Sequence, residues 1–353
     1  MASIKDVALR AGVSISTVSR VMNSSKNVSP ELAKKVQNAI KELDYSANLA
    51  AHSLRSIRSR LIAVIVTSFS RPFFTGVLEG INAIAEEEDY TVLLAETHDS
   101  LTDEIKLVSE FEARCVDGII LASSAYGKDS NTRNYIRSLS NLKKKGRPIP
   151  VVTLEYAFQG TDLSAVVVDN EQSAYDAVTY LIRELGRKDI IHISLPYQHY
   201  LGQQRMEGYK RALRSAGIPL RKEYIHEGDY STYSGYRITN GLIRSGEAFD
   251  AIFCANDQMA VGAVLACNEN AVSIPDQIAI VGNDDIFAAS LVRPSLTSIR
   301  VPQYEMGTSA MRVLLELIEG KNSGRKIVTL NTQMVMRGTT VKGYQDDLKN
   351  LIW

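Results

Sequence analysis

Residues 14–20, with the sequence SISTVSR, carry side chains suited to nucleic-acid recognition. Helical spacing predicts that Val18, Val21 and Met22 turn inward. The opposite face of this predicted helix then presents Ile15, Ser16, Thr17, Ser19 and Arg20. Hydroxyl groups, an arginine and one apolar side chain are suitable for reading a major groove and contacting phosphates. Because this face lacks the Glu and Lys mixture of a solvated helix, the pattern favours DNA binding over a purely structural role.

A second predicted helix precedes this one, over residues 4–11. Val7, Ala8 and Ala11 lie at helical spacing and share one apolar face. Gly12 follows where a residue of positive φ commonly closes a helix, and Ser14 is suited to cap the next one. The two helices and the turn between them predict a helix-turn-helix.

A third helix is expected to begin after Ser29 and Pro30, an N-cap and a first-turn proline, and to continue to Leu43. These helices predict an all-α headpiece over residues 1–46. The first 60 residues hold ten Lys and Arg against four Asp and Glu, a net charge of +6, so the remainder carries −6. A basic amino-terminal module on an acidic body is typical of polyanion binding.

Residues 47–60 form a predicted linker with two basic clusters and little apolar periodicity. They are either a flexible tether or a short helix that folds only when docked, because two helical turns do not persist alone in water. Leu54 followed by Arg55 suits the second case, since an apolar wedge beside a cation fits a minor groove.

From residue 61 onward, short apolar runs alternate with segments of helical periodicity. Eight runs, among them LIAVIV, SAVVVD and IAIVGND, predict buried parallel strands covered by helices on both faces. We expect two doubly wound sheets in a core over residues 61–353, with a closed eight-stranded barrel as the alternative. Two sheets would leave a ligand-binding cleft between their carboxyl edges.

Polar residues follow several of these runs, namely Glu155, Asp169, Asn170, Asn256, Asp257, Asp284 and Asp285. Together with Arg205, such carboxylates and amides suit a ligand with many hydroxyl groups. Phe73, Phe74 and Tyr230 offer flat apolar faces for a sugar ring or a base. The alternative is helix capping, which we expect for Asp169 and Asp257.

Catalytic motifs are missing from the sequence: there is no G-x-S-x-G, H-E-x-x-H, Walker A or G-x-G-x-x-G pattern. The three cysteines form no C-x-x-C pair, which argues against a zinc or disulfide framework. We therefore expect no enzyme, no metal and no cofactor. The longest apolar run is too short for a membrane span and no secretory signal is recognisable, so the expected location is the cytoplasm.

The chain resembles the lactose-repressor/galactose-repressor family of bacterial transcription regulators over nearly its whole length. The resemblance is carried by IKDVALRAGVSISTVSRVMN, VSPELAKKVQNAIKELDY, NLAAHSL, FCANDQMAVGA, VGNDD and RPSLTSI. It implies a homodimer that binds a palindromic double-stranded DNA operator. It also implies a periplasmic-binding-protein-like core whose two subdomains are joined by three crossovers, at about residues 61–161 with 293–323, and 162–292 with 324–353.

The resemblance also assigns roles to individual residues. Ile15, Ser16 and Arg20 take the positions of major-groove readers. Phosphate contacts are implied for Ser14, Thr17, Ser19 and Asn23, and minor-groove contacts for Ala51, Leu54 and Arg55. An effector pocket is implied for Phe73, Phe74, Glu155, His199, Arg205, Tyr230, Asn256 and Asp284. Two hinge positions depart from the common family pattern, Ala47 for Pro and His52 for Arg.

The effector is predicted to be a sugar or sugar derivative, because the implied pocket offers several partners for hydroxyl groups. The alternative is a purine corepressor, for which the aromatic residues Tyr230 and Phe74 would be stacking surfaces. A phosphocarrier-protein partner would need a basic core surface, which the net charge of −6 does not favour. A transport protein that binds solutes would not carry the headpiece.

Overall fold

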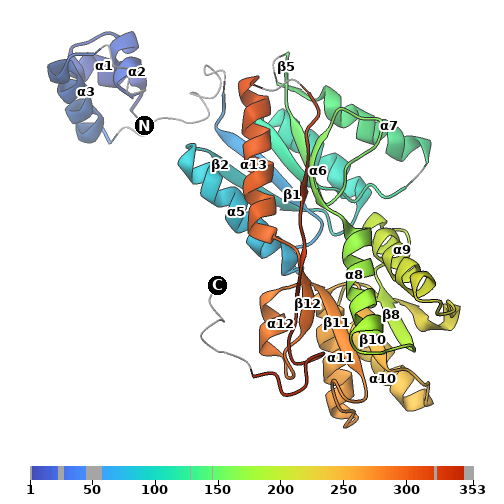
Figure 1. Ribbon diagram of the computed structural model, residues 1–353. Helices are drawn as coiled ribbons and strands as arrows, with labels where there is room; N and C mark the ends of the chain where they lie inside the picture. Colours follow the sequence, from blue (N-terminus) through green and yellow to red (C-terminus); the bar gives the residue numbers. More distant parts are fainter. Residues whose placement is uncertain are drawn as a thin grey trace. The chain divides into compact units, whose positions relative to one another are not determined.

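The computed structural model describes residues 2–22, 28–44, 58–127, 129–144, 146–321 and 324–345. The chain divides into two compact units, residues 1–59 and residues 60–353, each with its own hydrophobic core (Figure 1). None of the helices within the described ranges combines the length and the apolar character that crossing a bilayer requires.

The first unit contains three short helices, α1 (Ile4–Ala11), α2 (Ile15–Met22) and α3 (Pro30–Glu42). Val7, Val18 and Val36, one from each helix, are fully buried in a shared core. The apolar spacing along the sequence predicted this packing. An ion pair of 2.6 Å between Arg10 and Glu42 also joins α1 to α3.

The caps of these helices are those that the sequence predicts. Gly12 ends α1 with a φ of 66°, in the left-handed region that glycine adopts readily. The Ser14 hydroxyl accepts a hydrogen bond of 3.2 Å from the N–H of Thr17, in the first turn of α2. The Ser29 hydroxyl accepts one of 3.4 Å from the N–H of Leu32 at the start of α3. Each serine satisfies a backbone donor that the helix itself leaves unpaired, whereas the N–H of Gly12 donates to carbonyl oxygens in the last turn of α1.

The first sheet of the second unit has six parallel strands in the order β13-β7-β6-β3-β1-β2. They are β1 (Leu61–Val66), β2 (Thr91–Glu96), β3 (Gly118–Ala122), β6 (Val151–Leu154), β7 (Ser164–Val168) and β13 (Ile327–Leu330). Val64 packs on the face covered by α5 (Phe73–Glu87) and α13 (Gln303–Glu319), which lie side by side (Figure 1). Ile65 packs on the other face, under α6 (Leu101–Ala113) and α7 (Ser130–Ser138).

The second sheet has the order β14-β12-β11-β10-β8-β9 and is parallel except for the pairing of β12 with β14. Its strands are β8 (Ile190–Ser194), β9 (Ile225–Glu227), β10 (Ala251–Cys254), β11 (Ala279–Asp284), β12 (Thr297–Arg300) and β14 (Gln333–Val335). Helices α8 (Asn170–Arg183) and α9 (Tyr200–Ser215) cover one face. Helices α10 (Thr232–Ser245) and α11 (Asp257–Glu269) cover the other. Two open, doubly wound sheets confirm the predicted fold class, and the barrel alternative is wrong.

The remaining described elements are short. They are the antiparallel pair β4 (Lys143–Lys144) and β5 (Arg147–Pro148), the helix α12 (Phe287–Leu291), and the 3₁₀ turns Leu139–Asn141 and Lys222–Tyr224.

The predicted subdomain boundaries need correction. The chain crosses between the sheets after β7, after β12 and after β13, so residues 164–168 and 327–330 belong to the first sheet and residues 297–300 to the second. The sequence had placed each of these three strands in the other subdomain. An apolar run indicates that a strand is buried but not which sheet it joins. The pairing decides this: Val166 lies between Leu154 and Val328 in the first sheet.

Helices α5 and α13 approach each other to backbone contact. A β-carbon at Gly307 would lie 2.0 Å from the carbonyl oxygen of Val77, and one at Gly80 would lie 2.1 Å from that of Tyr304. Both glycines are therefore required by the close packing of the two helices rather than by backbone conformation.

Candidate functional site

The exposed face of α2 has the composition that the sequence predicts for a DNA-reading helix. Ile15 is 39% exposed, and Arg20 is exposed and forms no ion pair with any described residue. The Ser14 hydroxyl lies 2.7 Å from that of Ser16 and 2.9 Å from that of Thr17, so polar groups gather at the start of the helix. Helix α2 contains no acidic residue in its first turn.

The predicted DNA contacts of these residues, and of Ser19 beside them, remain predictions. Four further predicted contacts, together with the two departing hinge positions, lie outside the described residues: Asn23, Ala51, Leu54, Arg55, Ala47 and His52.

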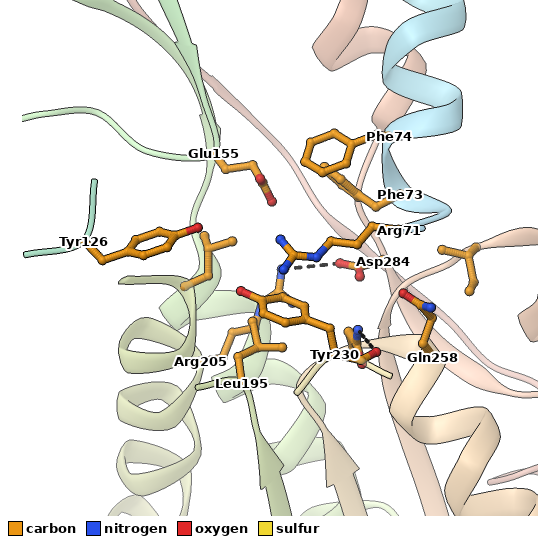
Figure 2. A pocket seen from close by; sticks show the side chains of 13 residues that line it. Arg71, Phe73, Phe74, Tyr126, Glu155, Leu195, Arg205, Tyr230, Gln258 and Asp284 are labelled. Carbon is orange, nitrogen blue, oxygen red and sulfur yellow. Dashed lines mark hydrogen bonds and ion pairs between the residues drawn. The ribbon is translucent and has the colours of Figure 1, made fainter. Parts of the chain in front are cut away.

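Within the second unit, a pocket lies at the carboxyl ends of the strands of both sheets (Figure 2). We call it the central pocket, and it is lined by Arg71, Phe73, Phe74, Tyr126, Glu155, Leu195, Leu201, Arg205, Tyr230, Asn256, Gln258, Asp284 and Ile286. Seven of the eight predicted effector residues are in this set. The open space at its centre is about 30 Å³, because the lining side chains fill most of the cleft.

Arg205 on α9 is the best-anchored polar group of the central pocket. It is 3% exposed, and its Nε donates a hydrogen bond of 2.9 Å to Asn170 at the start of α8. One terminal nitrogen donates to the carbonyl oxygen of Ala255, and the other forms an ion pair of 3.3 Å with Asp284. A buried guanidinium requires such partners, since an unpaired buried charge is costly. Arg205 is thereby fixed in position.

Glu155, directly after β6, and Asp284, at the end of β11, bring two carboxyl groups to the pocket (Figure 2). Their φ angles are 64° and 115°, a region that residues with side chains rarely adopt. Burial, together with the charge of Asp284, raises the pKa of Glu155 to about 7, although Arg205 and Arg71 favour its ionised form. Burial also raises the pKa of Asp284, against the opposing effect of Arg205.

The polar residues at strand ends divide between pocket and capping roles. Asn256 does both: its oxygen caps α11 by accepting from the N–H of Met259 at 3.0 Å, and its nitrogen donates to the Tyr230 carbonyl oxygen. Asp169 caps α8, as expected. The expectation that Asp257 caps a helix is wrong, because Asn256 caps α11. The Asp257 carboxylate accepts hydrogen bonds from the N–H of Ile286 and the Ser298 hydroxyl instead.

His199 is the predicted effector residue that lies behind the pocket wall. Its Nδ1 lies 2.7 Å from the Tyr230 hydroxyl, and its ring stacks on Tyr126 with 4.0 Å between centroids. Burial lowers the pKa of His199, which favours its neutral form. Its place in the structure is that of a support for two lining aromatic residues.

Arg71 is the main pocket residue that the sequence reasoning missed. Its guanidinium lies over the ring of Tyr230, 3.6 Å from the ring centroid (Figure 2). The same guanidinium forms an ion pair of 2.6 Å with Asp99. Arg71 and Asp99 belong to the first subdomain and Tyr230 to the second, so this contact crosses the cleft. The sequence feature that could have pointed to Arg71 is its position in the loop after β1, two residues before Phe73. Tyr126 and Gln258 also lie just beyond strand ends and were missed.

No group of His, Cys, Asp and Glu side chains among the described residues could hold a metal ion. The lining of the central pocket itself offers hydrogen-bond donors and acceptors, charged groups and apolar rings.

The helical headpiece and the two-sheet core define a class of protein, a DNA-binding module joined to a small-molecule-binding domain. Residues 3–48 match the family model described as bacterial regulatory proteins of the lacI family, and residues 178–340 match a periplasmic binding protein-like domain. Catabolite control protein A of Priestia megaterium is 33% identical over 339 residues, which cover 96% of this chain and 99% of the relative. The HTH-type transcriptional repressor PurR of Erwinia tasmaniensis is 32% identical over 348 residues, which cover 98% of this chain and 99% of the relative.

Solved structures agree with this assignment. The lac repressor dimer bound to operator and the anti-inducer ONPF is 27% identical with a TM-score of 0.84, covering 96% of this chain and 99% of that one. A complex of the transcriptional regulator CelR with cellobiose is 28% identical with a TM-score of 0.70, and the match covers 96% of this chain and 100% of that one. The chain belongs to the lacI family of bacterial regulatory proteins. It is a DNA-binding transcriptional regulator and, as the sequence predicted, not an enzyme.

Proposed function

We propose that this protein is a repressor that binds a palindromic operator as a homodimer and is controlled by a neutral sugar or sugar derivative in the central pocket. In each protomer, α2 enters the major groove with Ile15, Ser16 and Arg20 toward the bases. The predicted minor-groove contact of Leu54 bends the operator between the half-sites.

The observation that carries the sugar proposal is the balance of charge in the central pocket. Two guanidinium groups, Arg71 and Arg205, face two carboxyl groups, Glu155 and Asp284. Such a lining offers donors and acceptors, and it carries no net charge when both carboxyl groups are ionised, which suits a neutral ligand with several hydroxyl groups. Asn256 adds an amide beside these groups.

The aromatic residues favour a sugar over a purine. The rings of Phe73 and Phe74 lie edge to face, at 74° and 5.3 Å between centroids, so they do not form two parallel walls for a flat base. The ring of Tyr230 already carries the Arg71 guanidinium on one face. A sugar ring needs one apolar face and polar groups around its edge.

Both subdomains line the central pocket, which suggests how a ligand controls the protein. Phe74 and Glu155 come from the first subdomain, and Arg205 and Asp284 from the second. A ligand that contacts both has a different affinity for open and closed arrangements, so it shifts the equilibrium between them. It also has to move Arg71 away from Tyr230, because that pair occupies the cleft.

The test uses the full-length protein and thermal shift against glucose, galactose, ribose, cellobiose, hypoxanthine and guanine. At least one neutral sugar is expected to raise the melting temperature, and Arg205→Lys is expected to lose the shift. Arg244→Lys on the exposed surface of α10 is the matched control and keeps the shift. A shift by purines alone would contradict the sugar proposal, and a shift retained in Arg205→Lys would contradict the site. Operator affinity with and without the active sugar, measured on DNA selected from a random pool, tests repression.

A further inference from the structure

A second cavity lies beside the central pocket and is the larger of the two, with about 310 Å³ of open space. We call it the side pocket. Residues of both subdomains line it: α7 and the segment after β6 in the first, and the start of α9 in the second. The ring of Tyr126 lines both cavities, and its stacking on His199 forms part of the partition between them.

One wall of the side pocket is aromatic. The rings of Tyr156 and Tyr200 lie 4.0 Å apart at an angle of 40°, and Phe158 contacts Tyr156 edge-on at 4.5 Å. Both tyrosines are partly exposed and line the cavity, so they retain accessible ring surface. Such surface suits the apolar face of a sugar ring.

A second part of the lining is cationic. Arg133 and Arg137 are four residues apart on α7, so both side chains lie on the same face of the helix. Both are exposed, and neither forms an ion pair or hydrogen bond through its side chain with any described residue. The lining contains no Asp or Glu. The side pocket therefore attracts anions, in contrast to the balanced charge of the central pocket.

We propose that the side pocket is a second ligand site, for a monosaccharide that carries a phosphate or carboxylate group. The sugar ring lies against Tyr156 and Tyr200, and the anionic group is bound by Arg133 and Arg137. Guanidinium groups pair with the oxygens of either anion through two parallel hydrogen bonds. The side chain of Gln203, whose amide nitrogen donates to the Tyr197 carbonyl oxygen, presents an amide oxygen for a hydroxyl group.

The position of the side pocket couples it to the regulatory movement. Tyr156 belongs to the first subdomain and Tyr200 to the second, so a ligand on both rings stabilises the arrangement in which they meet. Ligands in the two pockets then affect each other's affinity by the same factor. This part of the inference rests on the proposed function, whereas binding in the side pocket does not.

The test is isothermal titration calorimetry of the full-length protein with glucose 6-phosphate, glucuronate, glucose and inorganic phosphate. We expect at least one of the two anionic sugars to bind about tenfold or more tightly than glucose and phosphate. The double variant Arg133→Ala/Arg137→Ala is expected to bind the anionic sugar about tenfold or more weakly than the wild type does. Tyr200→Ala is expected to weaken this binding as well. Arg114→Ala, an exposed arginine after α6, is the matched control and binds as the wild type does.

Three results would overturn the proposal. They are no binding of either anionic sugar, equal binding of inorganic phosphate alone, and affinity unchanged in the double variant with an intact melting temperature. Loss of anion binding in Arg205→Lys but not in the double variant would assign the anion to the central pocket, which also contradicts the proposal. The thermal shift by a neutral sugar is expected to survive in the double variant, so failure here is distinguishable from failure of the proposed function.

Discussion

Replacing Glu155 by Gln is expected to stabilise the protein at alkaline pH. The folded state holds this carboxyl group with a pKa of about 7, against an ordinary value of 4.5. Between these two values the unfolded chain has released the proton and the folded chain has kept it. Raising the pH through this window therefore favours unfolding of the wild type, whereas the neutral amide of the variant feels no such effect.

The size of the effect follows from the two pKa values. The penalty for the wild type is about 0.8 kcal/mol at pH 5 and about 3 kcal/mol at pH 8, if the pocket does not relax. The free energy of unfolding of Glu155→Gln, relative to the wild type, is thus expected to grow by about 2 kcal/mol over this range. Asp257, whose pKa burial raises to about 8, titrates in both proteins and cancels in the difference.

The measurement is urea-induced unfolding of both proteins at pH 5, 6, 7 and 8, without any added sugar. Glu110→Gln, at an exposed position on α6, is the control, and its difference from the wild type should stay constant with pH. A difference for Glu155→Gln that is flat with pH, or that falls toward pH 8, would refute the assignment of a buried, proton-holding carboxyl group to the pocket.

Further predictions concern the pocket ligand, the headpiece and the helix packing. Sugar hydroxyl groups donate to an ionised Glu155, so sugar affinity should rise about tenfold between pH 6 and pH 8, and calorimetry should find no such rise in Glu155→Gln. Arg20→Ala should cost about 1–3 kcal/mol of operator binding and relax selectivity at one base pair, and equal losses on operator and random DNA in an anisotropy assay would contradict a base contact. Gly307→Ala should lower the free energy of unfolding by about 1–3 kcal/mol because its β-carbon would meet the Val77 carbonyl oxygen. Gly241→Ala, with no neighbouring atom within 4 Å, should be neutral or stabilising by up to about 1 kcal/mol in the same urea titration.

The fold could be predicted from the sequence where burial is strong and apolar. Each of the eight apolar runs is a strand. Seven of them are central and almost wholly buried, because central parallel strands bury both faces and therefore read as continuous hydrophobic segments. The expectation of burial was wrong for β2, an edge strand without a buried residue. The strands that the pattern missed lack this signal. β13 and β14 are edge strands with exposed positions. β12 is buried at its first three positions, but its sequence is Thr297, Ser298, Ile299 and Arg300, with a single apolar residue. Because these strands surround the crossovers, the subdomain boundaries were wrong as well.

The site was predictable where a residue follows directly on a strong strand, as Glu155 and Asp284 do. The other positions were predicted from their residue types, except His199, which only the resemblance to a known family supplied. Arg71 and Tyr126 could not be found in this way, because loops have no periodicity and because their contacts join segments far apart in the chain. His199 shows the converse: a position can match an effector pocket while its side chain serves as a support.

The pairing of β13 with β7 has a consequence for biosynthesis. The first sheet cannot be completed until residue 330 has left the ribosome, whereas the three headpiece helices need only the first 44 residues. At bacterial rates of about 5–20 residues per second, the headpiece is folded for tens of seconds before its core exists. A nascent chain in that interval offers one isolated reading helix to any DNA nearby. If operator binding needs two headpieces held by a finished core, as we propose, this requirement also prevents unfinished chains from occupying operators.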